Sequence, residues 1–181
     1  YFRIIQPNSD LLLRLINDIL DLSRLEANKV ILTPEDCDVV QLCRQALSSV
    51  EMSRRESGNR FVFETKTDSF VLQTDIQRLQ QVLINLLTNA AKFTKNGTIT
   101  LQFEVEKEKN RVLFAVADTG CGIPKEKQKQ VFERFEKLNE YAQGTGLGLS
   151  ICKLTVDKWG GDIWIDPDYE GGASFVVSHP L

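Results

Sequence analysis

Residues 81–94 read QVLINLLTNAAKFT, and this stretch predicts a long amphipathic helix. Its apolar residues recur at three- and four-residue intervals, which places them on one helical face that needs a core to pack against. Asp75 precedes the first turn as a cap, and the helix is expected to run to about Phe93. The apolar face comprises Leu79, Val82, Leu83, Leu86, Leu87 and Ala90.

The opposite face of this helix carries three polar side chains in register, Asn85, Asn89 and Lys92. A solvated helix surface is the plain interpretation of three such residues. Asparagine is nevertheless a weak helix former, because its side chain competes for backbone hydrogen bonds. An amide oxygen also suits Mg²⁺ that is otherwise held by phosphates and water, and a lysine one turn on would then meet those phosphates. Both interpretations stay open on this stretch alone.

Signals for further helices and strands surround the helix. We expect an amphipathic helix at 38–56, strands at 60–66 and 69–73 that alternate as a pair, a hairpin of 98–107 and 111–118, a helix at 147–159, and strands at 162–166 and 172–179. Residues 119–146 are expected to form a long loop, of the kind that often closes over a binding site. Helices on one side of a mixed, mostly antiparallel sheet define an α+β fold, a two-layer α/β sandwich.

A leucine stripe at residues 8–29 predicts a separate helix, which either starts at residues 8–10 or continues from upstream. The stripe consists of Leu12, Leu15, Ile19, Leu22 and Leu25. It needs a partner helix to cover it, and no neighbouring segment of the sequence supplies one. Thr33-Pro34 and an acidic cluster break the pattern. We therefore expect a domain boundary near residue 32, which divides the chain into residues 1–32 and 33–181.

The strand expected at 111–118 ends in a carboxylate and a glycine-rich turn, DTGCGIP at residues 118–124. Apolar residues on both of its faces predict a buried central strand, where Asp118 needs a partner. Asp118 either forms a turn by bonding the backbone of Gly120, or accepts a hydrogen bond from the exocyclic amine of adenine. In the second interpretation the glycines let a flat ring approach the backbone. Guanine would be rejected, because it presents a carbonyl at that position.

A third cluster, GTGLGL at residues 144–149, opens the last expected helix. Backbone N–H groups of a glycine-rich turn and of a helix N-terminus together form an anion site. The cluster matches neither the dinucleotide-binding pattern nor the P-loop pattern. A flexible hinge is therefore an equal alternative for this cluster taken alone.

Composition excludes several classes of protein. The 181 residues carry a net charge of −3, which gives no electrostatic reason to expect nucleic acid or an anionic membrane as a partner. The single histidine, His179, excludes a multi-histidine metal site. The four cysteines show no C-x-x-C pairing and are expected to be reduced thiols. No apolar run approaches the length of a membrane span, and we expect no signal peptide.

In this order and at these spacings, the three clusters resemble the ATP-binding domain of sensor histidine kinases, within the gyrase, MutL and chaperone ATPase superfamily. Residues 81–94 are similar to the family's N box, residues 118–124 to its first glycine box and residues 144–149 to its second. VFERFEK at residues 131–137 resembles the phenylalanine box, and LINDILDLSRLEA at residues 15–27 resembles the end of the second helix of the dimerisation and phosphotransfer region. The resemblance covers the whole chain.

The resemblance implies a site for ATP and Mg²⁺. Asn89 would ligate Mg²⁺, and Lys92 would meet a phosphate. Phe93 would lie against the nucleotide, and Asp118 would read the adenine amine. Ser174 would either back the adenine pocket or be an ordinary strand hydroxyl. The other residues implied are Asn85 on the N box, Gly120, Gly122 and Ile123 at the base, Lys137 in the lid, and Gly144, Thr145, Gly146, Leu147, Gly148 and Leu149 around the phosphates.

One position of the resemblance separates kinase from ATPase. In gyrase-like and MutL-like ATPases a glutamate four residues before the metal-binding asparagine activates water. Asn85 occupies that position here and cannot act as a base, which predicts transfer of the phosphoryl group to a protein side chain instead of hydrolysis.

The nucleophile of the family is a histidine on the first dimerisation helix. The chain is expected to start after that helix, so we expect no catalytic residue and no autophosphorylation from these residues alone. His179 is expected to be structural, and Cys121 an inert small side chain.

The resemblance therefore implies the ATP-binding catalytic domain of a two-component histidine kinase that transfers the γ-phosphate of Mg·ATP. Its expected partners are a dimerisation helix of the same or a second protomer, in a homodimer of the full-length protein, and the receiver domain of a response regulator. We expect neither nucleic acid nor membrane contact, and a place in the cytoplasm, either free or as the cytoplasmic portion of a membrane-bound sensor. The alternatives are a regulatory pseudo-kinase that only binds nucleotide and a related protein-serine kinase.

Overall fold

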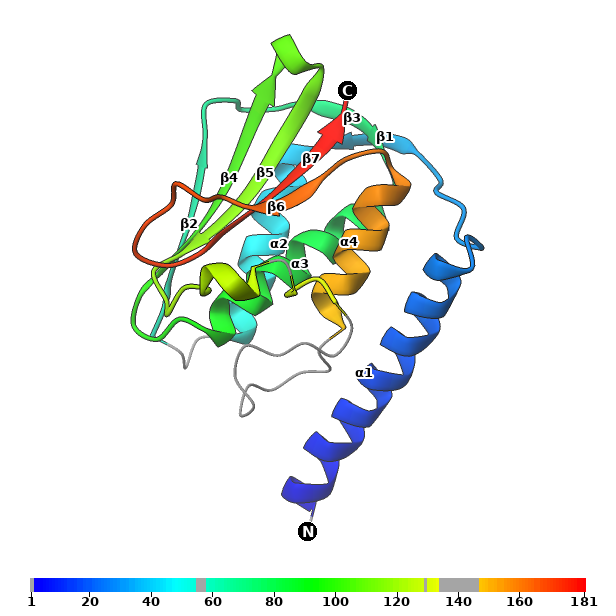
Figure 1. Cartoon of the computed structure of the whole chain (residues 1–181), viewed down its shortest axis with the longest axis vertical. Helices are drawn as coiled ribbons and strands as arrows, with labels where there is room; N and C mark the ends of the chain where they lie inside the picture. The colour runs from blue at the N-terminus through cyan, green and yellow to red at the C-terminus, as the bar shows by residue number, and fades with distance from the viewer. Residues whose placement is uncertain (1, 55–57, 129, 134–146) are drawn as a thin grey trace.

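A computed structural model of the chain describes residues 2–54, 58–128, 130–133 and 147–181. They form a five-stranded sheet in the spatial order β2-β4-β5-β7-β6. Three helices, α2, α3 and α4, pack on one face of it (Figure 1). The predicted α+β fold, a two-layer α/β sandwich, is confirmed.

Most predicted elements lie within a few residues of their expected bounds. The helices are α1 (Phe2–Glu26), α2 (Val39–Ser53), α3 (Ile76–Lys92) and α4 (Gly148–Lys158), with short 3₁₀ turns η2 (Lys107–Lys109) and η3 (Lys125–Lys127). The strands are β1 (Glu35–Asp38), β2 (Arg60–Thr65), β3 (Val71–Thr74), β4 (Thr98–Glu106), β5 (Arg111–Asp118), β6 (Ile163–Ile165) and β7 (Ser174–Pro180). Asp75 caps α3 as expected, because its Oδ1 accepts a hydrogen bond from the Arg78 N–H at 3.2 Å.

The expected pairing of β2 with β3 is wrong. Strand β2 runs parallel to β4 in the main sheet, whereas β3 pairs antiparallel with β1 in a separate two-stranded ribbon. Strand β1 was not predicted, because its acidic residues are typical of a linker. Three residues of the ribbon are buried, namely Cys37, its partner Leu72, and Thr74. The pair of Cys37 with Leu72 is therefore the one apolar contact that fixes the register.

The core lies between the sheet and the helices, and it faces one side of β5 only. Val112, Phe114 and Val116 are fully buried against the helices, whereas Leu113 and Ala115 on the opposite face are half-buried. The expectation of a strand buried on both faces is therefore wrong, since no described helix covers the outer face of the sheet. The strand is central in the sheet, as predicted, since β5 lies third of five strands.

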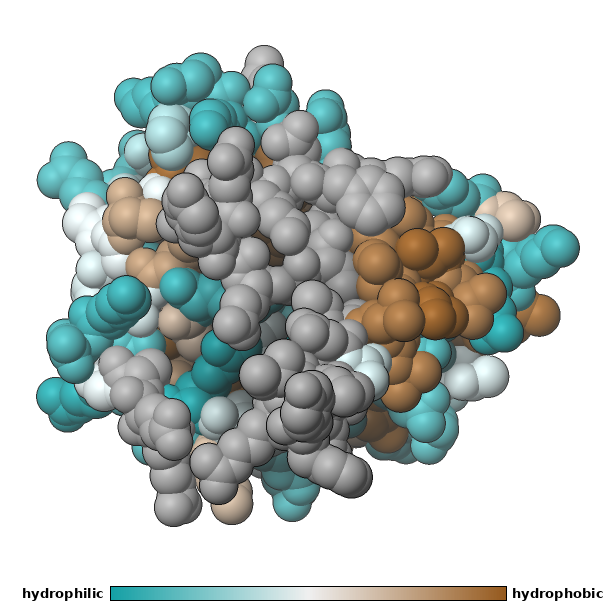
Figure 2. Space-filling model, turned by 90° about the horizontal axis from the view of Figure 1, so that it is seen from below, coloured by the Kyte–Doolittle hydropathy of each residue, from teal (hydrophilic) through white to brown (hydrophobic). Residues whose placement is uncertain are grey.

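Helix α1 starts at Phe2, so the leucine stripe continues a helix that is already formed at residues 8–10. Its N-terminal part projects away from the domain (Figure 1). Large apolar side chains are exposed along the middle of α1, and Figure 2 shows an apolar area on that side of the molecule. They are Leu12, Leu13, Ile16, Ile19 and Leu20, which are 42–58% exposed. Among the described helices, α1 included, none is long and apolar enough to cross a membrane.

The C-terminal part of α1 packs against the domain, in an apolar contact that we call the α1–α4 cluster. Leu22, Leu25 and Val30 pack with Leu147 and Ile151 of α4, and all five are buried. The stripe needs a partner helix, as predicted, and at this end the partner is α4, which is not a neighbouring segment of the sequence. The covering helix lies so far along the chain that local sequence patterns could not reveal it.

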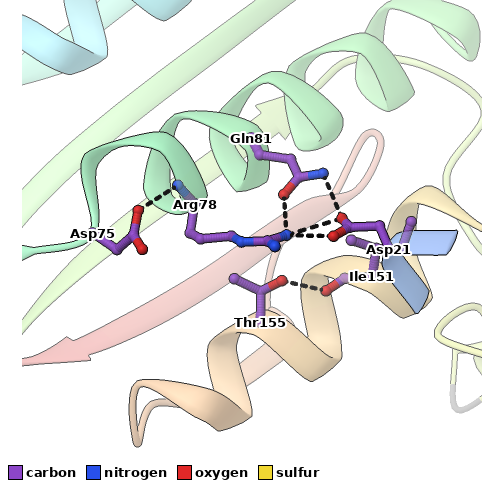
Figure 3. A network of polar contacts seen from close by, with 6 residues as sticks. All are labelled: Asp21, Asp75, Arg78, Gln81, Ile151 and Thr155. Atoms are coloured by element: carbon purple, nitrogen blue, oxygen red, sulfur yellow. Dashed lines mark hydrogen bonds and ion pairs between the residues drawn. The ribbon is translucent and has the colours of Figure 1, made fainter. Parts of the chain in front are cut away.

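Polar contacts beside the α1–α4 cluster join α1 to α3 (Figure 3). The Arg78 guanidinium donates to both carboxylate oxygens of Asp21, at 2.7 and 2.9 Å from Nη1. Gln81 donates to Asp21 at 3.0 Å and accepts from Arg78 at 3.1 Å. Asp75, whose one oxygen caps α3, also accepts from the Thr33 N–H at 3.1 Å. The first turns of α3 thus hold both the end of α1 and the segment that follows it.

Candidate functional site

A small cavity lies where the C-terminal end of α3 meets the end of β5 and the start of β7. It is lined by Asn89, Phe93, Asp118, Gly122, Ile123, Ala173 and Phe175. Five of these seven residues were predicted to bind nucleotide, and they come from three different elements or turns. The fold therefore brings the N box and the first glycine box of the sequence to one place.

Asp118 lies at the wall of this cavity and is 3% exposed. Its Oδ1 accepts hydrogen bonds from the Gly120 N–H at 2.9 Å and from the Ala173 N–H at 3.3 Å. The turn-forming interpretation of Asp118 is thus confirmed. In the part of the chain that the structure describes, Oδ2 receives no hydrogen bond, so one carboxylate oxygen is left for a ligand.

Burial raises the pKa of the Asp118 carboxyl, and the two backbone N–H groups act against that rise. A carboxyl group in this setting binds an amine donor strongly, because the donor replaces lost water and favours the charged form.

The glycines of the first glycine box serve the backbone as well as the cavity. A Cβ on Gly120 would overlap the carbonyl oxygen of Phe93, so the turn can only pass the end of α3 without a side chain. Gly122 has φ +71°, which favours glycine, and it lines the cavity. Gly120 contributes its N–H to Asp118 and is not among the lining residues.

The polar stripe of α3 has one member in the cavity and two beside it. Asn89 lines the cavity, and Lys92 is half-buried one turn further on. Asn85 lies next to the start of α4, since its Cγ is 3.9 Å from the place of a Cβ on Gly148. Burial raises the pKa of the Cys152 thiol to about 12, and a hydrogen bond with the Asn85 side chain acts against the rise. Asn85 thus lies at the junction of α3 and α4.

Only the end of the second glycine box belongs to the described residues. Leu147 is fully buried in the α1–α4 cluster. Gly148 is the first residue of α4, and Leu149 packs on the main core. The predicted site residues Lys137, Gly144, Thr145 and Gly146 lie outside the described part of the chain.

Ser174 faces away from the cavity. It pairs with Ala117 across the sheet, so its side chain lies on the outer face, on the opposite side from Asp118. There it borders a hollow with Ala115 and Val176.

His179 is buried and held by three neighbours. Its Nδ1 lies 2.7 Å from the Pro180 carbonyl oxygen, its Nε2 lies 3.0 Å from the Thr74 hydroxyl, and its ring packs on Trp159 with centroids 4.9 Å apart. Burial lowers the pKa of His179. The prediction of a structural histidine is confirmed.

Sequence reasoning missed two groups around Asp118. The Tyr169 hydroxyl donates to the Asp118 carbonyl oxygen at 2.9 Å, and nothing in the sequence marks that residue. A Cβ on Gly172 would overlap the same carbonyl oxygen. The pair Gly171-Gly172 was an available signal for this close approach.

No cluster of three or more histidine, cysteine or carboxylate side chains that could hold a metal ion occurs among the described residues. A Mg²⁺ ion at this site would depend on few protein ligands. Asn89 offers an amide oxygen in the cavity, which fits an ion held chiefly by phosphate oxygens and water.

Comparisons with known proteins agree with the geometry. The profile of the histidine kinase-, DNA gyrase B-, and HSP90-like ATPase family matches residues 74–181. The circadian input-output histidine kinase CikA of Synechococcus elongatus is 38% identical over 187 residues, which cover 99% of this chain and 24% of CikA. The sensor histidine kinase TmoS of Ectopseudomonas mendocina is 34% identical over 99% of this chain and 19% of TmoS. The chain thus spans a quarter or less of these relatives.

Solved structures extend the likeness to α1. Full-length ShkA in complex with AMPPNP superposes with a TM-score of 0.89 at 30% identity, over 98% of this chain and 37% of that one. Histidine kinase ThkA in complex with the response regulator protein TrrA superposes with a TM-score of 0.79 at 30% identity, over 99% of this chain and 50% of that one. The chain belongs to the histidine kinase-, DNA gyrase B-, and HSP90-like ATPase family, and within it to the ATP-binding catalytic domains of histidine kinases.

Proposed function

We propose that the chain binds Mg·ATP in the cavity beside Asp118 and presents the γ-phosphate to a histidine on a dimerisation helix, as part of a two-component signalling kinase. The observation that carries the proposal is that the two oxygens of the Asp118 carboxylate have different surroundings. One oxygen is held by two backbone N–H groups, and the other has no described partner in a cavity lined by Phe93, Gly122 and Ile123.

This arrangement suits adenine. The free Asp118 oxygen accepts from the exocyclic amine, while Phe93 and Ile123 supply apolar surface for the ring. Guanine presents a carbonyl at the same position, so its oxygen and the Asp118 oxygen would both be hydrogen-bond acceptors with no donor between them. The unpaired acceptor would remain desolvated, which disfavours the wrong base.

Asn89 is the residue that we assign to Mg²⁺, and Lys92 the one that we assign to phosphate. When bound, Mg²⁺ neutralises charge on the phosphate oxygens during transfer. The positive end of α4 adds backbone donors for the phosphates at Gly148 and the residues that follow it. The role of the chain is therefore to bind and position the nucleotide, since no described side chain at the cavity is a nucleophile.

We propose phosphoryl transfer and not ATP hydrolysis, because Asn85 takes the place of the water-activating glutamate of related ATPases. Its amide cannot accept a proton at neutral pH. Its side chain also lies beside Gly148, the first residue of α4. Steady-state release of phosphate by the chain should therefore stay far below that of a gyrase-type ATPase.

We also propose that residues 1–32 are the end of a dimerisation region and that residues 33–181 are the catalytic domain. The docking of α1 through the α1–α4 cluster is consistent with a helix that presents a substrate to the domain. A receiver domain is the partner we assign to the full-length protein. The solved complex of ThkA with the response regulator protein TrrA supports this assignment.

The decisive experiment supplies ATP labelled at the γ-phosphate together with a separate peptide of a dimerisation helix that carries a histidine. We expect label on that histidine that is lost in acid. Binding without transfer would favour the regulatory pseudo-kinase, and acid-stable label on serine would favour the protein-serine kinase. Asp118→Asn should abolish calorimetric ATP binding while circular dichroism stays unchanged, and unaltered binding would refute the site.

A further inference from the structure

The loop between β6 and β7 holds the base-reading carboxylate from behind. Ala173 exchanges two hydrogen bonds with Asp118, since its carbonyl accepts from the Asp118 N–H at 2.9 Å and its N–H donates to Asp118 Oδ1 at 3.3 Å. Tyr169 of the same loop donates its hydroxyl to the Asp118 carbonyl oxygen at 2.9 Å. Within the same loop, the Asp168 N–H donates to Asp166 Oδ1 at 2.9 Å.

These contacts depart from a regular antiparallel ladder in one informative way. The pairs Val116 with Phe175 and Ala117 with Ser174 belong to the ladder of β5 and β7, and Asp118 faces Ala173 next. In a regular hydrogen-bonded pair the Ala173 N–H would donate to the Asp118 carbonyl oxygen. Here that N–H donates to the carboxylate, and the Tyr169 hydroxyl takes its place on the carbonyl.

We propose that Tyr169 is a positioning residue for base recognition, because its hydroxyl donates to the Asp118 carbonyl oxygen, the acceptor of the regular ladder bond, and so favours the Ala173 N–H on Oδ1. With Oδ1 held by Ala173 and Gly120, Oδ2 is the oxygen that remains for the base. This inference rests on the proposed role of Asp118 toward adenine. It adds a residue in a different loop that sets how strictly the amine is required.

The environment of Tyr169 agrees with this role. The residue is half-buried, and burial together with the charge of Asp118 raises the pKa of its hydroxyl. The hydroxyl therefore stays protonated and remains a donor at neutral pH. Without it, the Asp118 carbonyl oxygen is free to take back the Ala173 N–H, and the carboxylate loses one of its two fixed contacts.

The test compares the binding of ATP with that of purine riboside triphosphate, which lacks only the exocyclic amine. Tyr169→Phe removes one oxygen atom and keeps the ring. We expect the affinity for ATP to fall about three- to tenfold, with little change for the analogue, so that the preference for ATP shrinks by the same factor. The matched control is Ser178→Ala, which loses a hydroxyl that accepts from the Asp162 N–H at 2.8 Å in the same hairpin. It should lower thermal stability without changing the preference.

Equal losses for both nucleotides, or no loss, in Tyr169→Phe would overturn the inference. Failure of the proposed function has a different signature, because Asp118→Asn would then leave the preference for ATP intact. A second measurement, on the native chain, tests the inference if the Tyr169→Phe chain folds poorly. In the native chain, the Ala173 amide resonance should shift with the protonation of Asp118 when followed by NMR. An Ala173 amide that does not respond to that titration would also overturn the inference.

Discussion

Substitution of one leucine on α1 tests whether the end of this helix is bound to the domain. Leu25→Ala removes a side chain that is 6% exposed in the α1–α4 cluster. Leu12→Ala makes the same change nearly four helical turns closer to the N-terminus, where the side chain is 58% exposed. Leucine and alanine are both good helix formers, so the pair of variants differs in burial and hardly in helix propensity.

The magnitude follows from the cluster. A buried leucine shortened to alanine costs about 2–5 kcal/mol, and the low end applies here, because a surface cluster of five residues can partly close around the gap. We expect about 2–3 kcal/mol for Leu25→Ala and less than about 0.5 kcal/mol for Leu12→Ala. Since about 1.4 kcal/mol is a factor of ten, release of the α1 end should become about 30- to 150-fold more frequent.

Amide hydrogen exchange of α1 is the appropriate assay, because it reports local opening as well as global unfolding. Protection at residues 19–26 should fall in Leu25→Ala and stay unchanged in Leu12→Ala. Protection in β5 should stay the same in both variants if the helix opens separately. Equal protection of residues 19–26 in the two variants would refute the reasoning that this cluster holds α1.

Three further predictions concern contacts outside the cavity. In a double-mutant cycle of Asp21→Ala and Arg78→Ala, measured by urea unfolding, we expect a coupling of about 1 kcal/mol, because both side chains are about four-fifths buried. No coupling would mean that the ion pair is only incidental. Asp38→Ala removes an oxygen that caps α2 at Val40 and Gln41 and also binds the Phe70 N–H, and it should cost about 1–2 kcal/mol in the same assay. Stability should decrease as the pH falls below about 6.5, because burial lowers the pKa of His179 and the unfolded chain then binds the proton first. His179→Gln should reduce this loss of stability at low pH. An unchanged dependence of stability on pH would mean that other groups cause the loss.

The elements that the sequence predicted well carry strong local signals. Helix α3 has both a cap and a long apolar face, and its bounds agree with the prediction within a residue. The hairpin expected at 98–107 and 111–118 is also present, and Asn110 in its turn adopts φ +52°. Such features depend on neighbours within a few positions, so the sequence displays them directly.

The errors concern contacts between distant segments. The alternation of β2 and β3 showed that both are strands but could not show that β2 pairs with β4. The partner of the α1 leucines is on α4, more than a hundred residues away. Tyr169 was not predicted either, because its role depends on a single hydrogen bond to Asp118, which is distant in the sequence. Motifs identified the cavity residues, whereas the residues that support them from behind carry no motif.

The end of the second glycine box, residues 147–149, connects the α1–α4 cluster to the main core. Leu147 is buried in the α1–α4 cluster, whereas Leu149 packs on the main core. Gly148 lies between them and beside Asn85 of α3. A displacement of α1 that moves Leu147 therefore also moves the first turn of α4, because a helical turn shifts as a unit. Leu25→Ala should consequently weaken ATP binding although Leu25 does not line the cavity, and the Leu12→Ala chain should bind ATP normally. ATP affinity that is identical in the two variants would show that the glycine box is held by the main core alone.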